Sequence, residues 1–427
     1  MFLKTIARKY TEISLIKRII VGLVIGVVLA LLMPAAVVDG NDILMGVSEF
    51  IALLGSLFVS ALKAVAPILV FFLVISALAN ARAAGTMKMV IVLYIASTLI
   101  ASLVAVLASF AFPIDITLVQ NPSVEQSSPD GVGEVLTTLV MNIASNPVDS
   151  LVNANFIGIL AWAVMLGIAL RAASQNVKDV FTAVSDAVST VVRWVINLAF
   201  GILGLVYTSV SENGMDIFIE YGQLILVLVA CMFFIALITN PLLVFAVTRK
   251  NPYPLVLRCL KDSGITAFFT RSSAANIPVN MELCRKLGLN KDNYSLSIPL
   301  GATINMAGAA VTIAVMTMAA THTLGISVDP ITAVILCVLS AVSACGASGV
   351  AGGSLLLIPL ACSLFGIEPD VSMQIVAIGL IIGVIQDSCE TALNSSSDVL
   401  FTATADYFIQ LKEGKTVNMG KDAEVQE

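Results

Sequence analysis

The sequence predicts an all-α membrane protein with eight transmembrane helices and two re-entrant hairpins of opposite orientation. Three observations lead to this fold class: the composition, a series of long apolar stretches, and the charge of the segments that connect them. Of the 427 residues, 58% are hydrophobic and only 12% are charged. Soluble domains carry about 25% charged residues, so the composition is typical of a chain that lies in a bilayer.

Six apolar stretches in the N-terminal half are long enough to cross a membrane. A spanning helix needs about 20 mainly apolar residues, and the first stretch is longer than the apolar region of a usual signal peptide. We therefore expect the first stretch to be a transmembrane helix and not a cleaved leader. The stretches cover residues 19–38, 50–79, 89–112, 135–170, 195–210 and 221–247.

The segments that connect these stretches alternate in charge. Lys and Arg concentrate on the cytoplasmic side of membrane proteins, so the alternation predicts cytoplasmic N- and C-termini in a bacterial inner (cytoplasmic) membrane. Residues 113–134, which carry acids and several Pro, Ser and Gly, are predicted to be a long external loop. Acidic segments without Lys or Arg are 39–49, 113–134 and 211–220, and the basic ones are 80–88, 171–193 and 249–261.

The C-terminal half departs from simple crossings at two places. Residues 263–281 are too polar to span and are flanked on both sides by basic residues, which predicts a re-entrant hairpin with its tip at 270–276. Residues 331–365 are apolar, have acidic flanks, and are interrupted by a glycine-rich run at 345–354. They predict a second hairpin that enters from the opposite side.

A spanning helix is predicted after each hairpin, at 294–320 with a break at 305–308, and from 371 to about 411. Two hairpin-plus-helix units of opposite orientation indicate an inverted repeat, because irregular backbone at membrane depth is tolerated only inside protein or beside a cavity. A channel vestibule or merely irregular helices are the alternative.

The last span carries an unusual density of polar residues between 386 and 398. A helix advances 100° per residue, so the polar side chains at five of these positions fall on one side of it. Each charged side chain at the bilayer centre costs about 2.5–3.5 kcal/mol, which predicts a functional role for this face. Its members are Asp387, Glu390, Thr391, Asn394 and Asp398.

Other polar groups could complete a site around this face. Arg271, at the tip of the first hairpin, is a possible counter-charge for one carboxylate, and Asn305 lies in the predicted helix break. Carbonyls freed at the break, together with Asp398, would make an oxygen cage for an alkali cation. Hairpin tips and helix N-termini offer N–H groups to an anionic carboxylate, so the set suits a zwitterionic amino acid.

Four motifs of the C-terminal half resemble the dicarboxylate/amino acid:cation symporter family, which has the fold of glutamate and aspartate transporters. The motifs are TRSS at 270–273, SIPLGATINM at 297–306, GASGVAGG at 346–353 and D-x-x-E-T-x-x-N-x-x-x-D at 387–398. Within the family they are most similar to the bacterial serine/threonine:sodium symporter branch. The resemblance implies sodium-coupled import of small neutral amino acids, L-serine and L-threonine above all, by alternating access.

The resemblance also implies a homotrimer in a lipid bilayer and a division of the chain. Residues 1–250 would form a six-helix half that contains the scaffold and part of the transport domain. Residues 251–412 would form the transport core, and 413–427 a cytoplasmic tail. Na⁺ is the implied co-transported ion, a small neutral amino acid is the implied ligand, and no nucleic-acid partner is expected.

Residue roles follow from the same resemblance. Asp387 would hold the substrate ammonium, and Thr391 would point into the same pocket. Asn394 would meet the substrate carboxyl together with backbone groups at Ser273, Val350 and Gly353. One sodium site would use main-chain oxygens of Gly301, Asn305 and Asn394 with the Asp398 carboxylate, and a second would lie near Thr303, Ala344 and Ala347, beside the Met306 sulfur.

Two positions depart from the family pattern. Glu390 stands where members that carry acidic substrates have an arginine, so it would repel a second carboxylate and disfavour glutamate, aspartate and dicarboxylates. Ala307 stands where the family has an aspartate in its NMDG motif. A third sodium site would lose its charged ligand there, although Tyr94, Ser97 and Thr98 resemble the rest of that site.

Two other functions remain as alternatives. One is a proton-coupled or dicarboxylate carrier on the same fold. The other is an intramembrane hydrolase, which the absence of GxSxG and HExxH motifs disfavours. With one histidine, His322, and seven cysteines that form no CxxC pair, neither a multi-histidine metal centre nor a zinc site is indicated.

Overall fold

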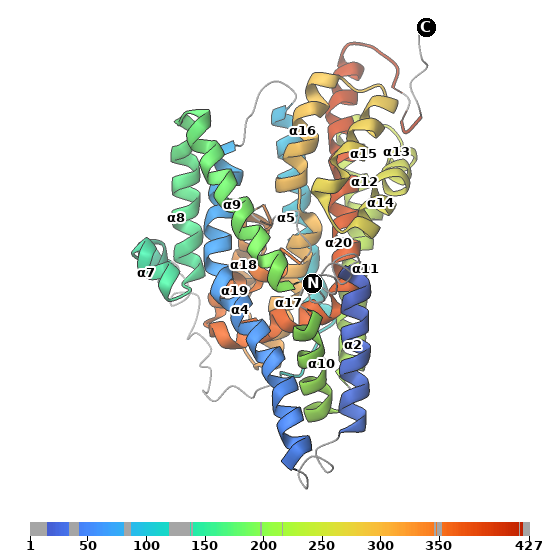
Figure 1. The fold of residues 1–427 in the computed structure, drawn as a ribbon. Coiled ribbons are helices and arrows are strands. Elements are labelled where there is room, and N and C mark those ends of the chain that lie inside the picture. The colour runs from blue at the N-terminus through green and yellow to red at the C-terminus, as the bar shows by residue number, and fades with distance from the viewer. Residues whose placement is uncertain are drawn as a thin grey trace, which may run out of the picture.

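The computed structural model describes residues 15–33, 42–80, 87–118, 137, 140–196, 199–215, 217–345, 347, 352–417 and 419–421. Within these residues every regular element is a helix (Figure 1). Five helical runs are long and apolar enough to cross a membrane, which confirms the predicted class of an all-α membrane protein. They are Asp42–Asn80, Met87–Ala111, Phe218–Thr248, Lys291–Thr323 and Pro369–Lys412.

The N-terminal half begins with long apolar helices, as the sequence predicts. The described helices are α2 (Leu15–Leu32), α4 (Asp42–Asn80), α5 (Met87–Ala111), α7 (Pro147–Val152), α8 (Phe156–Ala169), α9 (Gln175–Ile196), α10 (Ala199–Asn213), α11 (Ile217–Phe234) and α12 (Asn240–Thr248). A π-helical turn, η2 (Ile235–Thr239), joins α11 to α12, so these two form one helical run.

The stretch 135–170 is not one continuous helix. The chain leaves the helix between α7 and α8, and the side chain of Asn155 accepts a hydrogen bond from the Gly158 N–H, which caps the start of α8. Segment 171–193 was expected to be a charged connection, but most of it belongs to α9. This helix packs against α4, where the Thr182 hydroxyl bonds with the Ser76 hydroxyl and accepts from Asn80 Nδ2.

The first predicted hairpin region is a pair of helical arms with a tight reversal. One arm is α13 (Tyr253–Cys259), η3 (Leu260–Gly264) and α14 (Ile265–Thr270), and the other is α15 (Ser273–Lys286). Arg271 adopts a left-handed conformation with φ +51°, which ends α14, and the Ser272 hydroxyl accepts from Ala275 N and caps α15. The two arms contact each other, and both pack against the last helix.

The remaining elements include the predicted helix break. The run Lys291–Thr323 is divided into α16 (Lys291–Ile304) and α17 (Ala307–Thr323), with Asn305 and Met306 between them. It is followed by α18 (Pro330–Ala344), η4 (Leu355–Leu357), α19 (Ile358–Cys362), η5 (Ser363–Phe365) and α20 (Pro369–Lys412). At the start of α18 the Thr332 side chain donates to Asp329, which lowers the pKa of this exposed carboxyl.

Helix α20 lies at the centre of the C-terminal half. It packs against α11, α12, the first hairpin arms, α16 and α17. In Figure 1, α4, α8 and α9 stand on one side of the molecule, and α13–α15 with α20 stand on the other. Because other helices enclose the middle of α20, its polar residues between 386 and 398 are buried.

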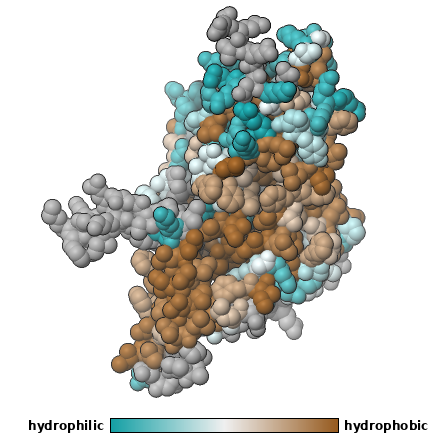
Figure 2. Space-filling model, turned by 90° about the vertical axis from the view of Figure 1, so that its right-hand side faces the viewer, coloured by the Kyte–Doolittle hydropathy of each residue, from teal (hydrophilic) through white to brown (hydrophobic). Residues whose placement is uncertain are grey.

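The surface separates into polar and apolar parts. Figure 2 shows a broad hydrophobic surface, with hydrophilic side chains gathered at the end where α15 and α20 finish and α16 begins. This end carries Arg285 and Lys286 in the last turn of α15, Lys291 at the start of α16 and Lys412 at the end of α20. The distribution is that of a protein whose sides face lipid.

Candidate functional site

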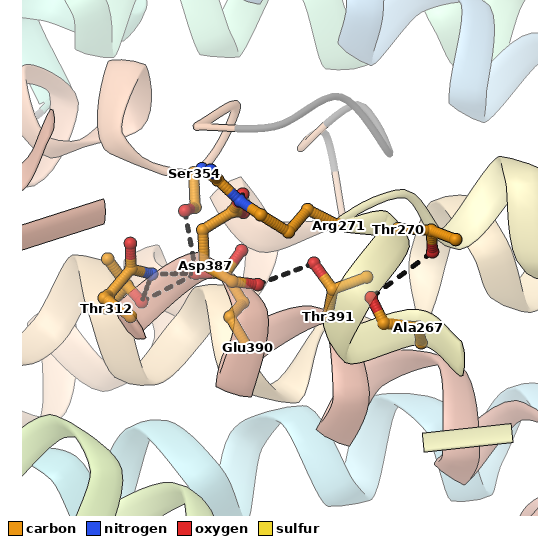
Figure 3. Close-up of polar contacts among 9 residues, drawn as sticks. Ala267, Thr270, Arg271, Thr312, Ser354, Asp387, Glu390 and Thr391 are labelled. Atoms are coloured by element: carbon orange, nitrogen blue, oxygen red, sulfur yellow. Dashed lines mark hydrogen bonds and ion pairs between the residues drawn. The ribbon is translucent and has the colours of Figure 1, made fainter. Parts of the chain in front are cut away.

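The polar residues predicted from the sequence lie in the middle of α20 and are buried. Asp387, Glu390, Thr391, Asn394 and Asp398 are all at most 6% exposed. Figure 3 shows that side chains from several elements converge on Asp387 and Glu390: Arg271 from the turn after α14, Thr312 from α17, and Ser354 from the segment before η4.

Asp387 is paired with Arg271. The Arg271 Nε atom lies 2.7 Å from Asp387 Oδ2, and both side chains are buried. The Thr391 hydroxyl donates to the main-chain oxygen of Asp387 at 2.7 Å, one helical turn away. A buried ion pair of this kind keeps both charges compensated at a depth where either charge alone would be costly.

Glu390 is held by neutral donors. Its Oε2 atom accepts hydrogen bonds from the Thr312 hydroxyl at 2.7 Å, the Ser354 hydroxyl at 2.8 Å and Gln386 Nε2 at 2.5 Å. Gly308 permits this approach, because a Cβ atom there would lie 2.9 Å from Glu390 Cα. Sequence reasoning did not assign roles to Thr312, Ser354 or Gln386; only Gln386, one turn before Glu390 on α20, carried a signal.

The helix break is tied to α20 by Asn305. Its Nδ2 atom contacts Asp398 Oδ1 at 2.9 Å, the Ser397 hydroxyl at 2.7 Å and the main-chain oxygen of Asn394 at 3.2 Å. Asn394 in turn faces the start of α17, because its Oδ1 accepts from Gly308 N at 2.7 Å and its Nδ2 donates to Met306 Sδ at 3.3 Å.

The same region contains two oxygens that suit a cation. Asp398 Oδ2 and Asn305 Oδ1 are buried and have no hydrogen-bond partner within the described part of the chain. Gly301 lies against the same carboxylate group, since a Cβ atom there would be 2.5 Å from Asp398 Oδ1. Carboxylate and carbonyl oxygens are the ligands that hard cations prefer. Of the other residues predicted for the first sodium site, Gly301 accepts from Asn305 N through its main-chain oxygen, and the main-chain oxygen of Asn394 accepts from Asn305 Nδ2.

The residues predicted for a second cation site flank the same break. Cys345 Sγ contacts the main-chain oxygen of Ile304 at 3.4 Å, which places the end of α18 beside the end of α16. The predicted residues Ala344 and Thr303 are neighbours of these two in the chain. Ala344, Ala347 and Met306 are buried, and Thr303 is exposed with its hydroxyl bonded to the Leu300 oxygen.

The structure describes two of the three residues whose backbone groups are predicted to meet a carboxylate. Ser273 is buried at the first position of α15, and Gly353 is buried directly before Ser354. Val350 lies outside the described residues. On α5, the Ser97 hydroxyl donates to Asn240 Oδ1 at 2.8 Å and the Thr98 hydroxyl to the Tyr94 oxygen, so both hydroxyls have protein partners.

Comparison with known proteins identifies the family. The model of the sodium:dicarboxylate symporter family matches residues 15–408. A protein of Streptococcus agalactiae serotype Ia named serine/threonine transporter SstT is 57% identical over 95% of this chain and 98% of its own length. A protein of the same name from Streptococcus thermophilus is 55% identical over the same shares. These relatives are named as transporters and not as enzymes. The chain belongs to the sodium:dicarboxylate symporter family.

Proposed function

We propose that the protein is a sodium-coupled symporter that imports small neutral amino acids, L-serine and L-threonine above all, by alternating access. The observation that carries the proposal is the buried polar face of α20, where Asp387 is paired with Arg271 and one Asp398 oxygen has no partner among the described residues. The names of the two streptococcal relatives supply the substrates.

The substrate would bind between the first hairpin turn, the segment at Gly353–Ser354 and α20. In this proposal Asp387 attracts the ammonium group, and Thr391 lies beside it. Asn394 and backbone groups at Ser273, Val350 and Gly353 would lie at the carboxyl end of the substrate, and Glu390 near its side chain. The support is that the described members of this set are buried and, on α20, neighbours on one helix.

Sodium would bind at the break between α16 and α17. The first site would use main-chain oxygens of Gly301, Asn305 and Asn394 with the Asp398 carboxylate. Its support is that Asp398 Oδ2 and the side-chain oxygen of Asn305 are buried without a partner among the described residues, and that Gly301 lies against the Asp398 carboxylate. The contact of α18 with the end of α16 supports a second site near Thr303, Met306, Ala344 and Ala347. Binding at a broken helix supplies carbonyl oxygens that a regular helix would keep for itself.

The dicarboxylates in the family description do not suit this site. Glu390 is one helical turn from Asp387, and no described Lys or Arg side chain bonds to it. A second carboxylate on the substrate would meet this carboxylate in a buried site. The position of Glu390 therefore favours neutral side chains, and the hydroxyls of Thr312 and Ser354 show that hydroxyl donors can be accommodated beside it.

The membrane arrangement belongs to the proposal as well. Eight transmembrane helices with two oppositely oriented re-entrant hairpins, cytoplasmic termini and a homotrimer in the inner membrane are consistent with the reversal at Arg271 and with the basic end shared by α15, α16 and α20. Residues 1–250 would supply the scaffold and part of the transport domain, and 251–412 the transport core.

The proposal is tested with purified protein in sealed lipid vesicles. Labelled serine should accumulate when sodium outside exceeds sodium inside, and accumulation should disappear when choline replaces sodium. Labelled threonine should behave in the same way. Uptake that follows a proton gradient and is indifferent to choline would instead support a proton-coupled carrier, and no uptake under either gradient would contradict the symport proposal.

A further inference from the structure

Arg271 has an unused donor inside the site. Its Nε atom is bonded to Asp387, while its Nη1 atom is buried and has no hydrogen-bond partner among the residues that the structure describes. The whole residue is only 6% exposed. Buried polar groups are nearly always hydrogen-bonded in folded proteins, and a guanidinium group stays charged. An unpartnered, charged donor at this depth indicates a place for an acceptor that arrives with a ligand.

The guanidinium group of Arg271 can bind Asp387 and a ligand at the same time through different nitrogens. It is a rigid planar fork whose nitrogens point in different directions, so the nitrogen that meets Asp387 cannot be the one that meets the ligand. In Figure 3 the guanidinium group reaches past Asp387 toward Ser354. Ser354 directly follows Gly353, one of the positions proposed to lie at the carboxyl end of the substrate.

The side chain of Asn394 is committed elsewhere. Its oxygen accepts from Gly308 N, and its nitrogen donates to Met306 Sδ, so it faces the start of α17. A substrate carboxylate therefore meets an engaged amide at Asn394 and a free, fully charged donor at Arg271. A hydrogen bond between two charged groups is stronger than one between an amide and a carboxylate.

We propose that Arg271 binds the α-carboxylate of the substrate through Nη1 while its Nε remains on Asp387. This inference rests on the proposed transport of amino acids. The substrate would lie head to tail against the ion pair, with its ammonium on Asp387 and its carboxylate on Arg271. Four alternating charges then neutralise one another, and the site selects molecules that carry an ammonium and a carboxylate on the same carbon atom.

The wild-type protein gives the first test. Labelled serine binding in sodium is competed with unlabelled serine and with serinamide, in which a neutral amide replaces the carboxylate. Loss of a charged hydrogen bond should make serinamide weaker by about tenfold or more. Serinamide that competes within twofold of serine would overturn the role of Arg271. Absence of any sodium-dependent serine binding would instead count against the proposed function.

The variant Arg271→Gln gives the second test. Serine should lose about tenfold or more in affinity while serinamide changes less, so that the ratio between the two ligands falls toward one. If Arg271 only neutralises Asp387, its removal strengthens or weakens both ligands by the same factor and the ratio stays at its wild-type value. That result would overturn the inference.

Two further variants serve as controls for the ratio of serine affinity to serinamide affinity. Arg285→Gln makes the same change at an exposed arginine that pairs with Glu282, and the ratio should remain that of the wild type. Arg271→Lys keeps the charge but has a single nitrogen in place of the fork, so it should reduce the ratio without abolishing it. For each variant, both affinities are measured on the same preparation of protein. If Arg271→Gln does not fold, the lower ratio expected for Arg271→Lys takes its place as the test.

Discussion

The buried carboxylates Asp387, Glu390 and Asp398 of α20 differ in their hydrogen-bond and ion-pair partners. Asp387 is matched by Arg271, whereas Glu390 and Asp398 have only neutral hydrogen-bond donors among the described residues. An uncompensated carboxylate in a dry interior is costly. The two carboxylates therefore differ in their surroundings: Glu390 has three neutral donors, whereas Asp398 keeps an oxygen without a described partner, which the proposed cation would neutralise.

Replacement of Asp387 by Asn should abolish serine uptake. The change removes the counter-charge of both Arg271 and the substrate ammonium, and breaking a buried ion pair typically costs about 3–5 kcal/mol, or several hundred-fold in affinity. Serine affinity is measured by competition in sodium, and gel filtration checks that the variant is folded. Near-normal serine affinity would remove Asp387 from the substrate site.

Glu390 should make the protein discriminate against aspartate. Two like charges about 4 Å apart repel by about 4 kcal/mol at an effective dielectric near 20, although the hydrogen bonds to Glu390 and the nearby Arg271 reduce this repulsion. We expect aspartate to compete with labelled serine at least about a hundredfold more weakly than threonine does. Glu390→Arg should improve aspartate binding more than it weakens serine binding.

Equal competition by aspartate and threonine in the wild type would contradict this assignment. Glu390 would then lie away from the substrate side chain, and its three donors would have a purely structural role. A useful control is Glu282→Gln, because Glu282 is an exposed carboxylate on α15 whose partner, Arg285, is exposed as well. In that variant, threonine should still compete with labelled serine more strongly than aspartate does.

The break between α16 and α17 depends on close helix packing at Gly301. A Cβ atom there would lie 2.5 Å from Asp398 Oδ1 and 2.8 Å from the Tyr94 hydroxyl, both of which are buried. Gly301→Ala should therefore displace Asp398 and weaken sodium binding by about tenfold or more, a loss of at least about 1.4 kcal/mol. The sodium concentration that gives half-maximal serine binding measures the effect.

Gly383→Ala is the matched control. Gly383 lies on α20 as well, but a Cβ atom there would meet nothing within 4 Å. Sodium dependence should be that of the wild type in this variant. If Gly301→Ala also leaves the sodium dependence unchanged, the oxygens around Asp398 do not form the coupling site.

Elements whose signal lies within one helix were predictable from the sequence. The cluster from Asp387 to Asp398 follows from helical spacing alone, and the break at Asn305 lies where the predicted span becomes polar. The break between α7 and α8 was missed because the apolar run hid the cap at Asn155. Helix α9 was missed because its charged residues were interpreted as a connection, although they occupy one face of an amphipathic helix.

Helical spacing and hydropathy could not predict contacts between segments that are distant in the sequence. Thr312 and Ser354 are ordinary residues of an apolar helix and a glycine-rich segment, and only folding brings them to Glu390. The engagement of Asn394 with Gly308 and Met306 likewise depends on how α17 begins after the break. Helical spacing locates a polar face, but it does not determine which neighbours that face will meet.

At the scale of the whole molecule, the polar face of α20 would connect the two proposed binding events. The residues proposed for the substrate, around Asp387, and those proposed for the cation, around Asp398, lie on one buried helix. Asn305 and Asn394 connect this helix to the start of α17. A bound cation at Asp398 would fix this junction before the substrate arrives. Coupling of this kind must be reciprocal, because each ligand changes the affinity of the other by the same factor.

Serine affinity as a function of sodium concentration, measured on purified protein at constant ionic strength with choline as the balancing cation, tests this coupling most directly. We predict that the serine Kd falls by about tenfold or more as sodium rises from micromolar to saturating concentrations, a typical allosteric coupling energy of about 1–3 kcal/mol. In Asp398→Asn the fall should shift to much higher sodium concentrations or disappear. A serine Kd that is the same with and without sodium would contradict sodium-coupled transport through this face of α20.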